Sequence, residues 1–224
     1  MTLSIIGRCS KTGQMGIAIS SSSIAVGARC PWLRSIVGAV STQNITLPAL
    51  GPRILDRLQQ GATAETSLKA GLDTDDYAAW RQVTVMTTDG QSAFYSGEKT
   101  LGVNNALSGE NCVAAGNLLA NPDVIAAMVQ AFEQRSGHLA DRLIAAMQAG
   151  MSAGGEAGPV HSAALSIVDS PVWPIVDLRV DWTDADPIDE LNQLWQAYQP
   201  QMQDYITRAL DPTQAPSYGV PGDE

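Results

Sequence analysis

Threonine at position 2 is the first residue of this sequence whose chemistry calls for an explanation. Cells commonly remove an initiator methionine when the next residue is small, so we expect removal of Met1 to leave Thr2 as the first residue. An N-terminal threonine carries a hydroxyl that can attack a carbonyl and an α-amine that can accept the hydroxyl proton. The pKa of such an amine is normally about 7.7–8.0, close to operating pH. We therefore expect Thr2 to be a nucleophile, against the alternative that Thr follows Met1 for no chemical reason.

The residues after Thr2 predict a strand that would hold it in place. Residues 2–8 are suited to an extended conformation, with Leu3 and Ile5 on one face. Most domains leave their first residues as a loose tail. A strand that begins at once would hold the terminus rigidly inside the fold, as a catalytic residue requires.

Other residues with reactive side chains are weaker candidates. The sequence has only two histidines, His138 and His161, so we expect neither a histidine-based metal site nor a cofactor. His138 lies at a predicted helix start and is expected to face solvent, whereas a structural role is the simpler interpretation of His161. Cys30 precedes Pro31 and is interpreted as a small buried residue, although a thiol enzyme remains a third hypothesis. Three cysteines without CxxC spacing indicate unpaired thiols in a reducing cytoplasm.

Composition limits the partners. Hydrophobic residues make up 45% of the 224 residues and charged residues 16%, which is typical of a globular protein with a sizeable core. The formal net charge of −10 argues against nucleic acid or an anionic membrane as a partner. Apolar runs are too short for a membrane span, and the first residues lack the pattern of a signal peptide. We expect a cytoplasmic protein.

The predicted elements alternate between groups of strands and pairs of helices. Strands are predicted at residues 2–8, 15–19, 36–43, 82–88, 91–95, 111–116, 162–168 and 175–181, and helices at 48–61, 63–71, 121–137, 139–150 and from 186 to the interruption by Pro200. Hairpin connections favour antiparallel sheets, and paired helices favour outer layers. The sequence thus predicts an α+β fold, a four-layer αββα sandwich of two antiparallel sheets flanked by helices. We expect a single domain over residues 1–210 and a flexible tail over 211–224.

Several segments together resemble the DUF1028 family, which is placed in the N-terminal-nucleophile (Ntn) hydrolase superfamily. The resemblance covers roughly residues 1–192 and rests on MTLSI at the start, AVG and PW near residue 30, VGAVSTQ, RQV, GNLL, and the GG loop followed by SAA. Each segment alone is weak, but their order and spacing are specific. The resemblance implies the same αββα sandwich.

The resemblance also implies roles for individual residues. Thr2 corresponds to the family's N-terminal threonine, the nucleophile. Asn117 lies in the GNLL segment and is the expected oxyanion donor. Ser21 corresponds to the serine that closes the second strand and is expected to orient the amine. Gln43 and Arg81 match polar positions that would hold a substrate, although a strand-end hydrogen bond and a surface ion pair are the structural alternatives.

The glycine-rich loop departs from the family pattern. Where the family tends to read GGDxRGxQSA, this chain reads GGEAGPVHSA over residues 154–163. Glu156 thus replaces an aspartate, His161 replaces a glutamine, and the arginine is absent. We expect Glu156 and His161 to contact the substrate. If the family's loop arginine anchors an anionic group of the substrate, this protein uses a different substrate.

We therefore predict an Ntn-type amidohydrolase that cleaves a C–N bond in a small molecule, such as an N-carbamoyl or related intermediate of amino-acid breakdown. The alternative is a non-catalytic protein that binds a small molecule and retains the Ntn fold, as a retained Met1 or the missing arginine would favour. Apolar residues such as Trp173, Trp195 and Tyr198 lead us to expect a homodimer, although they can equally cover the core.

Overall fold

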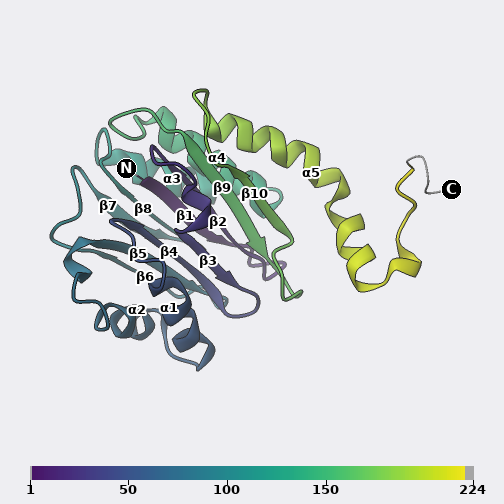
Figure 1. Ribbon diagram of the computed structural model, residues 1–224, viewed down its shortest axis with the longest axis horizontal. Coiled ribbons are helices and arrows are strands. Elements are labelled where there is room, and N and C mark those ends of the chain that lie inside the picture. Colours follow the sequence, from purple (N-terminus) through teal and green to yellow (C-terminus); the bar gives the residue numbers. More distant parts are fainter. Residues whose placement is uncertain (1, 220–224) are drawn as a thin grey trace.

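Two antiparallel sheets organise residues 2–219, the part of the chain that this computed structural model describes (Figure 1). The larger sheet has six strands, in the order β10 (Val176–Val180), β9 (Ser162–Val168), β2 (Met15–Ser21), β1 (Thr2–Arg8), β8 (Cys112–Asn117) and β7 (Asn105–Gly109). The smaller sheet has four strands, in the order β3 (Pro31–Arg34), β4 (Gly38–Asn44), β5 (Arg81–Thr87) and β6 (Ser92–Ser96). The strand that begins at Thr2 therefore lies inside the larger sheet, between β2 and β8.

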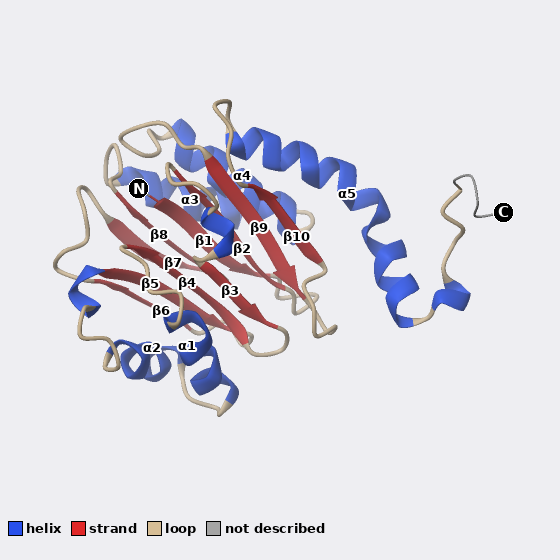
Figure 2. Cartoon of the chain, in the orientation of Figure 1, coloured by secondary structure: helices blue, strands red, loops and turns tan. Residues whose placement is uncertain are grey.

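Five α-helices pack against these sheets within the described residues (Figure 2). The helices α1 (Leu50–Gln59) and α2 (Ala64–Leu72) contact strands of the four-stranded sheet. In contrast, α3 (Asp123–Gln134) and α4 (Leu139–Ser152) contact β1, β2 and β8 of the six-stranded sheet. The fifth, α5 (Pro187–Leu210), contacts β9 and β10. The predicted mixture of helices and two antiparallel sheets is confirmed.

Strand β1 shows how the sequence pattern sorts side chains into layers. Leu3 and Ile5 belong to the core under α3 and α4, as the period-2 pattern predicts. Ser4 and Ile6 point the other way, and Ile6 packs with Ala39 of β4. The layer between the two sheets is thus apolar around Ile6, whereas polar side chains fill it near Thr2.

Two strands were missing from the prediction. Both β3 and β7 are edge strands, so each pairs on one side only, and each is short. Pro31 lies at the first position of β3, where its missing N–H does no harm to the ladder. Neither segment, PWLR in β3 or NALSG in β7, alternates between apolar and polar residues clearly enough to indicate a strand.

The prediction that Pro200 interrupts the last helix is wrong. Helix α5 continues through Pro200 to Leu210, and Figure 1 shows it bending part of the way along. Its first half is anchored by Trp195, which is fully buried and donates its indole N–H to Asp141 Oδ1 (2.8 Å). A short 3-10 turn, Pro212–Gln214, follows the helix. The single-domain boundary at 210 and the flexible tail remain predictions, and residues 220–224 of that tail lie outside the described residues.

Candidate active site at the start of strand β1

Thr2 lies in a row of polar residues that crosses the six-stranded sheet. The strand register places Asn117 of β8 opposite Thr2 on one side and Ser21 of β2 on the other, and Ser162 of β9 lies opposite Ser21. Opposite residues in an antiparallel pair point to the same face. Thr2 is only 5% exposed, and its Oγ1 lies 3.4 Å from Ser21 Oγ. The structure therefore brings together the three predicted catalytic residues Thr2, Ser21 and Asn117.

A chain of buried amides joins this row to the four-stranded sheet. Gln43 Nε2 donates to Gln82 Oε1 (2.9 Å), and Asn117 Nδ2 donates to the same oxygen (3.1 Å). Gln43 Oε1 in turn accepts a hydrogen bond from Ser4 Oγ (2.7 Å). All four side chains are essentially inaccessible to solvent. Gln43 thus lies between the two sheets and links Ser4 of β1 to Gln82 of β5 by hydrogen bonds.

Gln82 determines how the Asn117 amide is oriented. Gln82 Nε2 donates to Gly116 O and to Ser96 Oγ, both at 3.0 Å, so its Oε1 must point toward Asn117. Asn117 Nδ2 is therefore turned toward Gln82, and its second N–H remains available as a donor. Asn117 Oδ1 has no hydrogen-bond partner among the described residues, although it is buried. Gln82 was not among the predicted site residues, although it lies in RQV, one of the segments on which the resemblance rests.

Glu156 brings a buried carboxyl group to the same end of the sheet. The residue pairs with Leu119, just past the end of β8, and is 5% exposed. Neither carboxyl oxygen has a hydrogen-bond partner among residues 2–219. Burial raises the pKa of Glu156 to about 8, and the nearby Ser22 backbone N–H opposes this rise without completing a hydrogen bond. A carboxyl of this kind can gain or lose a proton near neutral pH.

His161 is attached to the site through its backbone rather than its ring. Its N–H donates to Ser21 O (2.9 Å), which extends the sheet beyond β9. The ring Nδ1 lies 2.8 Å from Thr183 O, and the ring stacks on Trp182 with centroids 4.3 Å apart. The imidazole is thus held by the segment between β10 and α5. It supports the end of β2.

Arg81 is held by an ion pair next to the site. Its Nε donates to Asp75 Oδ2 (2.7 Å) and its Nη1 to Ile45 O (2.6 Å). The two charged side chains are only 9% and 4% exposed. The guanidinium hydrogen bond holds the pKa of Asp75 below its usual range. The structure thus places Arg81 in a buried pair that braces the loops around β4 and β5.

Cys30 has the surroundings of a structural residue. It is 3% exposed and packs with Ile19, Val26 and Ala164. Burial raises the pKa of its thiol to about 11, so the nucleophilic thiolate is scarce at neutral pH. Among the described residues, no group of three or more His, Cys, Asp or Glu side chains is arranged to hold a metal ion. No helix in residues 2–219 is long and apolar enough to cross a membrane.

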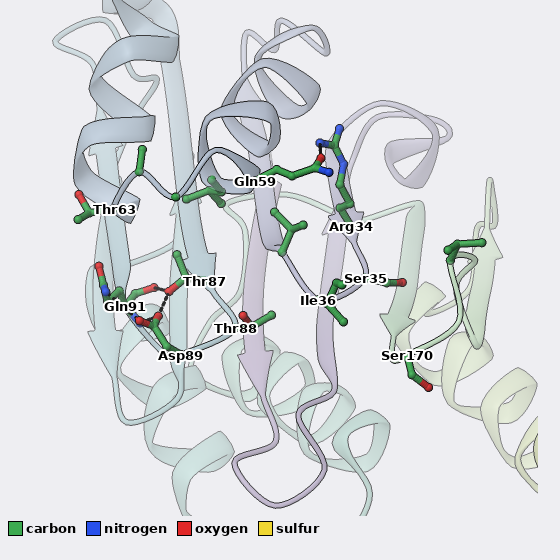
Figure 3. Close-up of a pocket in the computed structure, with 15 residues that line it drawn as sticks. Arg34, Ser35, Ile36, Gln59, Thr63, Thr87, Thr88, Asp89, Gln91 and Ser170 are labelled. Carbon is green, nitrogen blue, oxygen red and sulfur yellow. Dashed lines mark hydrogen bonds between the residues drawn. The ribbon is translucent and has the colours of Figure 1, made fainter.

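A separate cleft lies at the other end of the sheets (Figure 3). It has a volume of about 700 Å³ and is lined by the β3–β4, β5–β6 and β9–β10 turns together with the α1–α2 connection. Gly38 and Thr87, which pair at this end, are the last residues of the β4–β5 ladder away from Gln43. Arg34 on its rim is paired with Asp56 (2.9 Å). This cleft contains none of the predicted site residues.

Comparison with known proteins assigns the family. A family model described as a family of unknown function, DUF1028, matches residues 2–191, and the chain belongs to this family. One similar solved structure is protein SPO2555 from Silicibacter pomeroyi, also of DUF1028, with 28% identity, a TM-score of 0.85, and coverage of 91% of this chain and 89% of that one. Anbu (ancestral β-subunit) from Yersinia bercovieri aligns over 97% and 100% of the chains, but with 10% identity and a TM-score of 0.37. No curated protein matches the chain.

Proposed function

We propose that this protein is an N-terminal-nucleophile amidohydrolase in which Thr2 attacks the carbonyl of an amide-type bond. The observation that carries the proposal is the position of Thr2, buried at the start of a central strand with Ser21 and Asn117 directly opposite it. A nucleophile held this rigidly loses little entropy when the reacting atoms meet. The proposal requires that Met1 be removed, and Met1 lies outside the described residues.

The proposal includes the four-layer αββα sandwich of the Ntn hydrolases. In that arrangement α1 and α2 form one outer layer and α3 and α4 form the other, with the two sheets between them. The helix–strand contacts support this assignment, because each helix pair contacts a different sheet. Residues of both sheets also share the apolar cluster around Ile6 and Met86.

The catalytic step follows from the groups around Thr2. Thr2 Oγ1 forms a bond to the substrate carbonyl carbon while its proton passes to the α-amine of Thr2. The second N–H of Asn117 Nδ2 stabilises the oxyanion that forms. The C–N bond then breaks, the ammonium returns its proton to the departing nitrogen, and water hydrolyses the resulting ester. Ser21, predicted to orient the amine, has its Oγ 3.4 Å from Thr2 Oγ1, so we propose that it orients the hydroxyl instead.

The substrate class that we propose is a small non-peptide amide, such as an N-carbamoyl intermediate of amino-acid breakdown. The alternative function is binding of a small molecule without catalysis. It is favoured by the low exposure of Thr2 and by the absence of arginine from residues 154–163. We also propose that the protein forms a homodimer, with exposed apolar side chains such as Trp173 and Leu194 at the interface.

Removal of the Thr2 hydroxyl tests the proposal. Intact mass of the untagged protein first establishes whether Thr2 is the first residue. The parent protein, Thr2→Ser and Thr2→Ala are then incubated with a panel of N-carbamoyl amino acids and small amides, and ammonia and amine release are measured. We expect Thr2→Ala to lower kcat by roughly 10³-fold or more and Thr2→Ser to retain part of the activity.

A β-lactone probe provides a second readout that does not depend on the choice of substrate. It should acylate the Thr2 peptide of the parent and leave Thr2→Ala unlabelled. A chain that begins at Thr2, yet neither turns over the panel nor reacts with the probe, would show that the protein is not a Thr2 hydrolase. Ligand binding that is unchanged in Thr2→Ala, with no turnover in the parent, would favour the alternative.

A further inference from the structure

Glu156 lies at the end of the six-stranded sheet where β1 begins. Both strands beside β1 end opposite Thr2, at Ser21 of β2 and Asn117 of β8, and the chain goes on to Ser22 on one side and to Leu118 and Leu119 on the other. The backbone of Glu156 pairs with Leu119 on the β8 side. Its carboxyl group lies near the backbone N–H of Ser22 on the β2 side. The Glu156 carboxyl group therefore lies between the chain segments that follow β2 and β8, at the end of the sheet where β1 begins.

The loop that carries Glu156 is held firmly in that place. Ala157 N–H donates to Leu118 O (2.9 Å), and Ala120 N–H donates to Gly155 O (3.0 Å). Gly155 has φ +61°, and a Cβ at this position would lie 2.8 Å from Met151 Sδ. A glycine is needed here because it adopts this conformation without strain and leaves room for Met151. The position of the carboxyl group is therefore set by the backbone on either side of it.

The buried carboxyl group of Glu156 lacks a hydrogen-bond donor among the described residues. Its two oxygens are buried acceptors without donors among the described residues, and Asn117 Oδ1 is a third such acceptor at the same end of the sheet. Unsatisfied buried acceptors cost about 1–3 kcal/mol each, more when they are charged. A donor group with several N–H bonds would satisfy this cluster.

We infer that Glu156 holds the α-amino group of Thr2 in the chain that begins at Thr2. The inference rests on the proposed function for the removal of Met1. An α-ammonium group offers three N–H donors at the end of β1, where Glu156 and Asn117 Oδ1 provide acceptors. Glu156 is then a positioning residue: it turns the amine toward Thr2 Oγ1 and stabilises the ammonium that forms when the hydroxyl proton is transferred.

The groups near Glu156 indicate that the α-amine is its cationic partner, because His161 and Arg81 are already bound elsewhere. The ends of β2 and β8 contribute only serine, asparagine and leucine side chains here. The nearest histidine along the loop, His161, turns its Nδ1 to Thr183 O. Arg81 is already paired with Asp75. The raised pKa of Glu156, caused by burial, agrees with a carboxyl group that shares a proton with an amine near neutral pH.

The pKa of the Thr2 α-amine tests the inference directly. Cleavage of a fusion protein to leave Thr2 as the first residue makes the sample independent of cellular processing. The rate at which cyanate carbamoylates Thr2 is followed against pH by peptide mass mapping. We expect Glu156→Gln to lower the pKa of the amine by about one unit or more, because a nearby carboxylate favours the ammonium form. At a pH below the amine pKa of both the parent and the variant, the Thr2 amine of Glu156→Gln should then react with cyanate about tenfold faster than that of the parent. Glu65→Gln, at an exposed position on α2, should leave the profile unchanged.

An unchanged profile in a folded Glu156→Gln variant would overturn the inference. Where that variant does not fold, Glu156→Asp takes its place: it keeps the charge but shortens the reach, so a profile identical to that of the parent would count against the pairing. The measurement requires no turnover, so it remains decisive if no amide substrate is found. Conversely, if the Thr2 enzyme is active but its amine pKa is the same in the parent and in Glu156→Gln, the proposed function stands and only this inference is overturned.

Discussion

The residues beside Thr2 depend on one another for their hydrogen bonds. Gln82 Oε1 accepts from both Gln43 and Asn117, so two buried amides share a single acceptor. Gln82 is itself oriented by Gly116 O and Ser96 Oγ. A buried network in which every donor has a partner specifies one arrangement, whereas a partly satisfied network is costly. The orientation of the proposed oxyanion donor is thus decided by Gln82, a fully buried residue of the other sheet.

Replacing Gln82 with leucine should therefore affect both stability and activity. Gln82→Leu leaves Gln43 Nε2 and Asn117 Nδ2 without their shared acceptor. We expect the free energy of unfolding, measured in urea, to fall by about 1–3 kcal/mol for each unsatisfied donor. Gln203→Leu, at an exposed position on α5, serves as the matched control and should change it by less than about 0.5 kcal/mol. Equal stability of the two variants would show that the amide chain contributes nothing to the fold.

At the scale of elements, close contacts between helices and strands determine where the layers meet. Gly51 of α1 lies against the ring of Trp32 on β3, so that a Cβ would approach Trp32 Cγ to 2.1 Å. The ring is held by a hydrogen bond from its Nε1 to Arg29 O (3.2 Å). Gly150 of α4 instead faces Met128, whose Cγ would lie 2.7 Å from an added Cβ. Methionine is flexible enough to move, whereas the indole is not.

Two glycine-to-alanine substitutions compare these contacts. We expect Gly51→Ala to lower the free energy of unfolding by about 1–3 kcal/mol, because α1 must shift away from β3. Gly150→Ala should have a much smaller effect, because Met128 can adopt another rotamer and alanine favours the helix by about 1 kcal/mol. Thermal and urea unfolding of both variants provide the measurement. A Gly150→Ala variant as unstable as Gly51→Ala would show that α4 is packed as rigidly as α1.

At the scale of the whole molecule, the charge is unbalanced: the chain has 23 acidic residues and only 13 basic ones. Most ion pairs on such a surface are weak, as is that of Lys69 with Asp73, whose side chains are 75% and 60% exposed. The Asp75–Arg81 pair differs because both side chains are buried. The pKa of Asp75 is lowered in the folded protein, so the pair stabilises the fold above pH 3.8, the ordinary value, and this contribution is lost as pH falls through the folded pKa.

Asp75→Asn should be strongly destabilising near neutral pH. The variant leaves the Arg81 guanidinium buried without its carboxylate, which typically costs about 3–5 kcal/mol. Asp73→Asn, at the exposed pair, should cost less than about 1 kcal/mol. Urea unfolding near neutral pH and below pH 3.8 gives the comparison, and the difference between the parent and Asp75→Asn should shrink at the lower pH. A difference that is constant with pH would mean that Asp75 stabilises the fold by packing alone.

Several features were predictable because they depend on local sequence. The alternation around Leu3 and Ile5 indicates which face of β1 meets the helices, and the hairpin and glycine signals indicate antiparallel sheets with paired helices. Thr2 was identified from its position and chemistry, and Ser21 and Asn117 from the family resemblance. Strands β3 and β7 were not found because their sequences do not alternate clearly, and the continuation of α5 through Pro200 was not found because it depends on tertiary packing.

The sequence by itself thus determined the mixture of elements, the family and the identity of the candidate nucleophile, since these follow from residue type, order and spacing. Only the tertiary structure decided how the side chains combine. It paired Arg81 with Asp75, turned the ring of His161 toward Thr183, and made Gln82 the link between the two sheets. It also placed Glu156 between Leu119 and the Ser22 backbone N–H, at the end of the sheet where β1 begins. These contacts join residues far apart in the chain, so they exist only once both sheets have packed.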